Sequence, residues 1–371
     1  MKKRILVNAY FAKNLGDDLF LKVLFDRYPN VIWSLLTPNL EYEKIFNNYR
    51  NVKIIKSLLV KVGPKRFNLF QKLNDLLLNY NGYDAFLTIG GSIFMENSRW
   101  KEVLVQKREL PERFKKNNKK NFILGANFGP YTNKLFLDEH RNFFKLFDDI
   151  CFRDSYSYNL FPNEDNVRFA PDIVFNLQKS LTIEKEKCVA VSVICLQNRK
   201  ELKQYSEMYY QKVIQLMERY IIKGYKIKLC SFCEREGDLE IINYLINKIN
   251  TKYKNQIKVI NYHDDIDTFL DEFEKCEVVI GTRFHSVILA FIFNQGILPI
   301  IYSDKTYNVL KDLNMDQNVC HISKINELDI ENVVLTSSSN KLNNKEIFIK
   351  AAQQFKKLDD FLQYRGTVEI N

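Results

Sequence analysis

Residues Glu277 to Phe291 read EVVIGTRFHSVILAF. A short β-branched run ends at Gly281, polar residues follow, and a long apolar helix is predicted to begin a few residues later. This pattern is typical of a buried strand, a tight turn and a helix N-terminus, where free backbone N–H groups can bind an anion. Arg283 and His285 are predicted to project where the turn opens.

Length and composition are those of a globular protein. The chain of 371 residues is long enough for two domains, and 46% apolar and 27% charged residues are ordinary fractions. The formal net charge of +10 favours acidic ligands such as phosphorylated small molecules. The basic residues are spread along the chain without interleaved stacking aromatics, so we do not expect nucleic-acid binding.

The cysteines and the apolar segments indicate where the protein resides. Seven scattered cysteines form no disulfide-like framework, which favours a reducing cytosol. Cys230 and Cys233 form a lone C-x-x-C pair, which we interpret as structural because no second pair completes a zinc site. The N-terminus has no signal-peptide pattern, and the longest apolar segment, Val287 to Tyr302, is too short and interrupted to span a bilayer. We therefore expect a cytoplasmic protein without a bound metal, with at most peripheral contact with the inner membrane face.

Predicted strands and helices alternate along the chain, which indicates parallel sheets covered on both faces. The rhythm breaks in the polar stretch from Gln178 to Lys187, where we place a domain boundary. The predicted domains are residues 1–180 and 187–335, and residues 340–371 are predicted to contain a helix that packs back on them. Arg66 to Tyr80 is predicted to be an amphipathic helix. The predicted strands are 5–10, 31–36, 52–56, 84–89, 121–127, 149–152, 189–193, 226–231, 257–261, 277–281 and 297–302.

Loops that follow strands are the candidate binding loops, because ligands bind beyond the carboxyl ends of parallel strands. Asn14-Leu-Gly-Asp-Asp18 is a glycine turn that enters a helix. It is either a backbone site for an anion or a sugar hydroxyl, or only a capped turn, and it matches neither a P-loop nor a dinucleotide fingerprint. Gly90-Gly91-Ser92 either allows a ligand to approach the backbone closely or is a helix-entry turn.

Arginine and histidine side chains are the strongest candidates for binding or catalytic residues. Arg153 either grips a carboxylate or phosphate, or pairs internally with Asp154 or Asp172. Arg283 and His285 form the polar tip of an apolar element, and the helix N-terminus would keep the imidazole neutral and ready to accept a proton. No serine-hydrolase or zinc-protease motif is present, and Asp264-Asp265 is predicted to open the helix at Ile266. The other histidines are interpreted as structural residues in polar or charged surroundings: His140, His263 and His321.

Several short motifs occur along the chain in a fixed order: Asn14-Leu-Gly-Asp-Asp18, Gly90-Gly-Ser92, Gly129-Pro130, Phe152-Arg-Asp-Ser-Tyr-Ser157, Ala170-Pro-Asp172, Gly281-Thr-Arg-Phe-His285 and Lys305. Each motif is weak, but the ordered set resembles that of polysaccharide pyruvyl transferases over about residues 4 to 320. The resemblance implies two doubly wound, Rossmann-like α/β domains that face a cleft, as in GT-B proteins. It also implies an enzyme that moves the pyruvyl group of phosphoenolpyruvate onto a sugar.

The resemblance implies roles for individual residues. His285 matches the family's catalytic histidine. Arg153 and Arg283 match arginines expected to hold the phosphate and carboxylate of phosphoenolpyruvate, and Lys305 would add positive charge to the same pocket. The first-domain loops are expected to face the cleft on the acceptor side with Asn14, Asp17, Gly90, Gly91 and Ser92.

The expected substrates are phosphoenolpyruvate, as donor, and a sugar, oligosaccharide or lipid-linked glycan as acceptor. The product would be a pyruvate ketal on a sugar hydroxyl pair of a cell-surface glycan, such as an exopolysaccharide, or of its lipid-linked precursor. No cofactor is expected besides the donor. Two alternatives remain open at this point. One is a GT-B glycosyltransferase that uses a nucleotide sugar, and the other is a non-catalytic glycan- or anion-binding relative.

Overall fold

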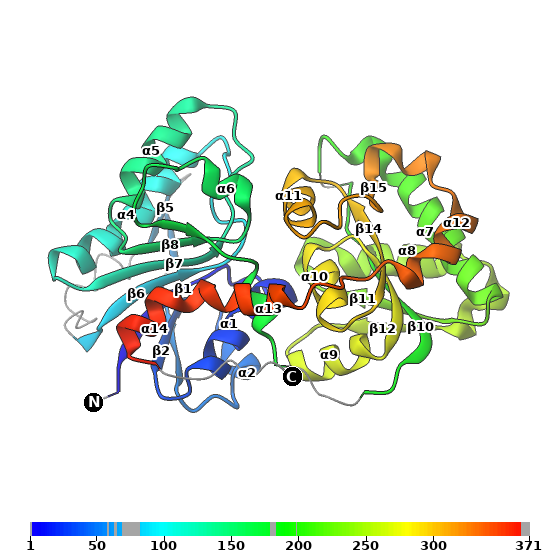
Figure 1. Cartoon of the computed structure of the whole chain (residues 1–371), viewed down its shortest axis with the longest axis horizontal. Helices are drawn as coiled ribbons and strands as arrows, with labels where there is room; N and C mark the ends of the chain where they lie inside the picture. The colour runs from blue at the N-terminus through cyan, green and yellow to red at the C-terminus, as the bar shows by residue number, and fades with distance from the viewer. Residues whose placement is uncertain are drawn as a thin grey trace. The chain divides into compact units, whose positions relative to one another are not determined.

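The computed structural model describes residues 2–57, 59–62, 65–68, 82–178, 183–197 and 199–364. The chain divides into two compact units, each built on its own parallel sheet (Figure 1). Unit 1 consists of Met1–Phe11, Phe20–Asn176 and Glu346–Ile370. Unit 2 contains Ala12–Leu19 and Leu177–Lys345. The segment Ala12–Leu19 therefore belongs to unit 2, although we expected its loop in the N-terminal domain, and the C-terminal helices belong to unit 1.

The sheet of unit 1 has the strand order β3-β2-β1-β6-β7-β8-β9, and all its neighbouring strands are parallel. The order reverses between β1 and β6, so the loops after these strands diverge at the switch point where doubly wound sheets bind ligands. The strands are β1 (Arg4–Asn8), β2 (Ile32–Thr37), β3 (Val52–Lys56), β6 (Ala85–Ile89), β7 (Lys120–Ala126), β8 (Asp149–Phe152) and β9 (Val167–Phe169).

A separate antiparallel pair, β4 (Leu59–Val62) and β5 (Lys65–Asn68), follows β3. The predicted helix from Arg66 to Tyr80 is wrong at its start, because Arg66 to Asn68 lie in β5. Its remaining residues lie outside the described part of the chain.

Helices cover both faces of the unit 1 sheet (Figure 1). On one face, α4 (Trp100–Lys116) and α5 (Lys134–Phe144) contribute Trp100, Phe114, Phe136 and Phe144 to an aromatic-rich core. On the other face lie the second part of α1 (Leu15–Arg27) and α14 (Lys356–Leu362). Among its described residues, unit 1 also has the short α-helices α2 (Tyr42–Ile45), α6 (Ser155–Asn159) and α13 (Glu346–Ala352).

The C-terminal segment is fastened to unit 1 by the buried amide of Gln354. Its Nε2 donates to the carbonyl oxygens of Phe152 (3.2 Å) and Ala170 (2.6 Å), and its Oε1 accepts from the N–H of Gly125 (3.1 Å). These bonds join the ends of β7 and β8 to the chain that follows α13. Hydrogen bonding at every polar atom is what makes the burial of an amide tolerable.

The sheet of unit 2 has the order β12-β11-β10-β13-β14-β15, again parallel, and reverses between β10 and β13. Its strands are β10 (Glu186–Ser192), β11 (Lys226–Ser231), β12 (Ile257–Asn261), β13 (Cys276–Gly281), β14 (Gly296–Ile301) and β15 (Cys320–His321). The two doubly wound α/β units confirm the predicted fold class.

Helices also cover both faces of the unit 2 sheet (Figure 1). One face packs against α7 (Ser206–Ile222), α8 (Asp238–Lys248) and α12 (Ile330–Thr336), and the other carries α9 (Ile266–Glu274) and α10 (Phe284–Ile292). Helix α11 (Asp304–Asp312) follows β14. As predicted, Asp265 opens α9, because its Oδ1 accepts the N–H of Thr268 at 3.0 Å. No helix in the described ranges is long and apolar enough to cross a membrane.

We predict that Gln354→Leu destabilises the protein by about 2–3 kcal/mol, because two carbonyls and one N–H lose their buried partner. Gln353→Leu is the matched control, because the Gln353 side chain is next to Gln354 in the sequence but is exposed. This substitution should change the free energy of unfolding by less than about 0.5 kcal/mol. Urea unfolding followed by circular dichroism measures both. Equal effects of the two substitutions would contradict the assigned role of Gln354.

Candidate functional site

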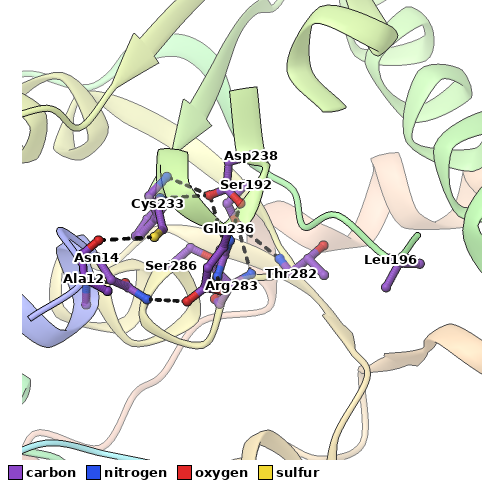
Figure 2. A network of polar contacts seen from close by, with 12 residues as sticks. Ala12, Asn14, Ser192, Leu196, Cys233, Glu236, Asp238, Thr282, Arg283 and Ser286 are labelled. Atoms are coloured by element: carbon purple, nitrogen blue, oxygen red, sulfur yellow. Dashed lines mark hydrogen bonds and ion pairs between the residues drawn. The ribbon is translucent and has the colours of Figure 1, made fainter. Parts of the chain in front are cut away.

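A cluster of polar side chains lies at the carboxyl ends of the unit 2 strands (Figure 2). Ser192 ends β10, Glu236 and Asp238 follow β11, and Arg283 follows β13. The strand order reverses between β10 and β13, so the cluster lies where a doubly wound sheet is expected to bind a ligand.

Ser192 joins the ends of the two strands at the switch point. Its Oγ accepts the N–H groups of Thr282 (3.1 Å) and Arg283 (3.3 Å), and it lies 2.6 Å from Ser286 Oγ. Ser286 Oγ also donates to the carbonyl of Arg283 at 2.6 Å. The turn that starts α10 is therefore fixed by the protein itself, and two N–H groups of the turn are already bonded to Ser192.

Arg283 forms a buried ion-pair network with two carboxylates from the loop after β11. Its Nε donates to Asp238 Oδ2 at 3.1 Å, its Nη2 to Asp238 Oδ1, and its Nη1 to Glu236 Oε2. Burial alone would lower the pKa of Arg283, but Asp238 and Glu236 outweigh burial and raise it above the usual arginine value. Arg283 is thus a fixed cation.

Asp238 holds the loop after β11 as well as the arginine. Its fully buried carboxylate accepts the N–H groups of Phe232 and Cys233, each at 3.0 Å. The carboxylate oxygens thus receive charged and neutral donors from two different loops. Removing the Asp238 carboxylate would leave the buried Arg283 with one carboxylate partner fewer, which is strongly unfavourable.

His285 packs against Gly16 in the segment Ala12–Leu19. A side-chain carbon added at Gly16 would collide with the His285 ring, with Nδ1 as the nearest atom. The predicted glycine turn and the predicted histidine turn therefore come together within unit 2, and only glycine fits under the ring.

Asn14 and Asp18 attach the same segment to unit 2. Asn14 Oδ1 accepts the N–H of Gly16 (3.1 Å), and its Nδ2 lies 3.4 Å from Glu236 Oε1. Asp18 is fully buried and accepts a 2.7 Å hydrogen bond from the hydroxyl of Tyr262. Asp17, the other predicted residue of this loop, is partly exposed in the first turn of α1, where its N–H donates to the carbonyl of Asn14.

Two further cations lie near this network. The Arg199 guanidinium lies 4.9 Å from the Tyr302 ring centroid and 3.7 Å from Glu236 Oε2. Lys305 is in the first turn of α11. Burial would raise the pKa of Tyr302, but Lys305, Arg199 and Arg283 lower it below the ordinary tyrosine value. Burial likewise opposes the low pKa of Glu236, which the same three cations produce. Lys305, Arg199 and Arg283 therefore outweigh burial at both Tyr302 and Glu236, and at Tyr302 they also outweigh the Glu236 carboxylate.

The remaining predicted residues lie together in unit 1, where Arg153 forms the internal pair that we considered as an alternative. Its Nη1 donates to Asp172 at 3.0 Å and its Nη2 to Asn127 at 2.8 Å, and all three residues are buried. A side-chain carbon at Gly91 would lie only 2.7 Å from the guanidinium.

The neighbours of this group have structural bonds of their own. Ser92 donates to Asn127 Oδ1 at 3.2 Å, and Gly90 has φ +150°, which favours glycine. Asp154 caps α6, where its Oδ1 accepts the N–H of Ser157 at 2.8 Å.

His140 is structural, but not for the reason that the sequence suggested. It is buried among aromatic rings rather than in polar surroundings, and its Nδ1 lies 2.7 Å from the Phe136 carbonyl. Burial lowers its pKa to about 4.

Cys230 and Cys233 are both buried free thiols, and burial raises the pKa of Cys233 to about 12. No group of three potential metal-ligating side chains occurs among the residues that the structure describes.

Comparison with known proteins assigns the family. The model of the polysaccharide pyruvyl transferase family matches residues 14–304, which include every unit 2 residue of the network around Arg283. The chain belongs to the polysaccharide pyruvyl transferase family. A curated relative is the amylovoran biosynthesis protein AmsJ of Erwinia amylovora, 21% identical over 87% of this chain and 89% of the relative.

The solved structures that resemble this pyruvyl transferase family member share its fold at low sequence identity. A putative UDP-N-acetylglucosamine 2-epimerase from Listeria monocytogenes has a TM-score of 0.60 at 12% identity, covering 99% of this chain and 98% of the other. MurG of Acinetobacter baumannii has a TM-score of 0.52 at 11% identity, covering 98% and 99%. At such identities the likeness shows the GT-B-type fold alone.

Four residues near the turn that carries His285 were not predicted from the sequence: Arg199, Glu236, Asp238 and Tyr302. Each follows a strand of unit 2, so the rule that identified Arg283 also applies to them. Arg199 lies after β10, Glu236 and Asp238 lie after β11, and Tyr302 lies after β14. No glycine-rich or histidine-containing motif marks those loops.

We predict that Gly16→Ala displaces the His285 ring while the fold persists, because the added carbon collides with the imidazole. The ¹⁵N resonances of the four histidines, measured on protein labelled at histidine, report the change. The His285 signals should shift and those of His140 should stay. Gly82→Ala is the control, since its nearest neighbour is the flexible end of Arg4 at 3.2 Å. Unshifted His285 signals in Gly16→Ala would contradict the packing.

Proposed function

We propose that the chain transfers the pyruvyl group of phosphoenolpyruvate onto a hydroxyl pair of a cell-surface glycan or its lipid-linked precursor. The products are a pyruvate ketal and phosphate. The proposal is supported chiefly by the surroundings of His285. This residue lies at the start of α10 and packs against Gly16, and loops of the same unit contain Arg199, Arg283 and Lys305. A histidine beside several cations suits a small trianionic donor that must be protonated.

The chemistry requires one proton transfer to carbon and two additions to the same carbon. Protonation of the methylene carbon gives a methyl group and an oxocarbenium-like centre at C2. One sugar hydroxyl adds to C2, the bond between C2 and the phosphate oxygen breaks, and the second hydroxyl closes the ketal. The two hydroxyls lose two protons in total. One of these protons ends on the methyl group and the other on phosphate, so the reaction balances.

In this proposal His285 moves the proton, and Arg283 holds the turn that carries it. Because Arg283 is paired with Asp238 and Glu236, it acts as a fixed positive charge rather than a mobile clamp. Direct contact of Arg283 or Arg153 with the donor stays a prediction. Arg153 would act on the Gly90-Gly91-Ser92 loop, against which it packs in unit 1.

The acceptor sugar is expected to contact the glycine-containing loops. The residues predicted to contact the sugar are Asn14, Asp17 and the Gly90–Ser92 loop. Asn14 and Asp17 belong to unit 2. We propose a cytoplasmic protein, and a lipid-linked acceptor would bring it into peripheral contact with the inner membrane face.

We predict that His285→Asn lowers phosphate release from phosphoenolpyruvate by about 10²–10⁴-fold, because a general acid–base group contributes about that much. Donor binding should change by less than about threefold, since Asn retains a polar side chain of similar size. The assay is phosphate release in the presence of sugar or lipid-linked glycan acceptors, with donor binding measured by calorimetry.

His263→Asn is the matched control, because His263 is an exposed residue of the same unit, and it should retain full activity. Full activity of His285→Asn would remove the histidine from the mechanism. If the wild-type protein releases no phosphate with any acceptor but turns over a nucleotide sugar, the proposed donor is wrong.

A further inference from the structure

We propose that the N-cap and first turn of α11, Ser303 to Thr306, together with Arg199, bind the phosphate group of the donor. The inference rests on the proposed function, because it assigns one end of phosphoenolpyruvate to a defined set of residues. Lys305 and Thr306 lie just beyond the residues matched by the family model, which ends at residue 304.

Two buried hydroxyls in this turn have no hydrogen-bond partner among the residues that the structure describes. They are Ser303 Oγ and Thr306 Oγ1, and Thr306 is 2% exposed. Buried hydroxyls are normally bonded, because an unsatisfied one costs stability. Two of them in one turn indicate that another group supplies the acceptor atoms.

Ser303 occupies a helix N-cap but does not cap with its side chain. The usual N-cap serine accepts the N–H of the third helical residue through its Oγ. Here that N–H, from Thr306, donates to the backbone carbonyl of Ser303 at 3.2 Å instead. Helix α11 has nine residues, so its N-terminus also contributes backbone N–H groups and a partial positive charge. Hydroxyls and N–H groups in one turn suit the oxygens of a phosphate.

Arg199 adds a cation that is held loosely. Its distance of 3.7 Å from Glu236 is longer than a hydrogen bond, and its side chain is 38% exposed, compared with 7% for Arg283. The guanidinium lies over the ring of Tyr302, the residue that directly precedes the α11 turn. Arg199 can therefore turn toward an anion at the turn without breaking a short ion pair, whereas Arg283 cannot.

The charges around the turn support an anion there. Burial and the Glu236 carboxylate would raise the pKa of Tyr302, yet Lys305, Arg199 and Arg283 lower it, so these three cations outweigh both at the phenol. Asp304 carries the negative charge in the turn, but it is exposed, so water and salt screen it. Phosphate leaves the donor during the reaction, so a site that neutralises it stabilises the departing group.

The test uses the full-length protein and calorimetric titration with phosphoenolpyruvate and inorganic phosphate. Thr306→Val keeps the shape of the side chain and removes the hydroxyl. We expect Kd for both probes to rise about tenfold, the effect of one lost hydrogen bond to a charged group. The unfolding temperature should stay equal or rise, since an unsatisfied buried hydroxyl is replaced by a methyl group. Ser303→Ala should weaken binding in the same direction.

Thr336→Val is the control, because Thr336 is an exposed residue of the same unit, and its binding constants should match those of the wild type. If Thr306→Val and Ser303→Ala bind both probes as tightly as the wild type, the phosphate assignment is overturned while the proposed function stands. If the wild type binds uridine diphosphate but neither probe, the proposed function is overturned and the assignment with it.

Discussion

The buried ion pair between Arg283 and Asp238 is the interaction on which the unit 2 site depends. It connects the loop after β11 to the turn before α10, and Asp238 also holds two backbone N–H groups of its own loop. Breaking a buried pair by removing one partner costs about 3–5 kcal/mol, because the other charge is left uncompensated. The position of His285 follows from this pair, since the histidine lies two residues after the arginine on the same turn.

Unit 1 uses a similar arrangement with different residues. Arg153 follows β8, pairs with the fully buried Asp172 and lies against Gly91. In both units an arginine after one strand is held by an aspartate from another loop. Fixed arginines shape the loops, whereas loosely held cations such as Arg199 can respond to a ligand. Arg153 and Arg283 are cations of the first kind, and Arg199 is a cation of the second kind.

Much of the fold could be predicted from the sequence, because buried parallel strands are continuous apolar runs. The strands Val52–Lys56, Asp149–Phe152, Lys226–Ser231 and Ile257–Asn261 agree with the prediction residue for residue. Strand β9, with three residues, and β15, with two, are too short to show a pattern. The start of the segment from Arg66 shows the limit of periodicity, since its apolar spacing suggested a helix where β5 forms.

The site could be predicted only in part. Arg283 and His285 stand out because a charged pair interrupts an apolar stretch. Glu236 and Asp238 resemble ordinary surface carboxylates in the sequence, and only the fold brings them to Arg283. The contact between Gly16 and His285 joins residues separated by most of the chain, so no local pattern reveals it.

Transfer of a pyruvyl group, rather than of a sugar, distinguishes the proposed reaction from that of a GT-B glycosyltransferase. The most direct measurement incubates the protein with phosphoenolpyruvate labelled with ¹³C at C2 and a glycan acceptor, and follows the label by NMR. We predict that the label appears in the glycan as a quaternary ketal carbon, with one phosphate released for each ketal. A label that stays in phosphoenolpyruvate while a nucleotide sugar is consumed would contradict it.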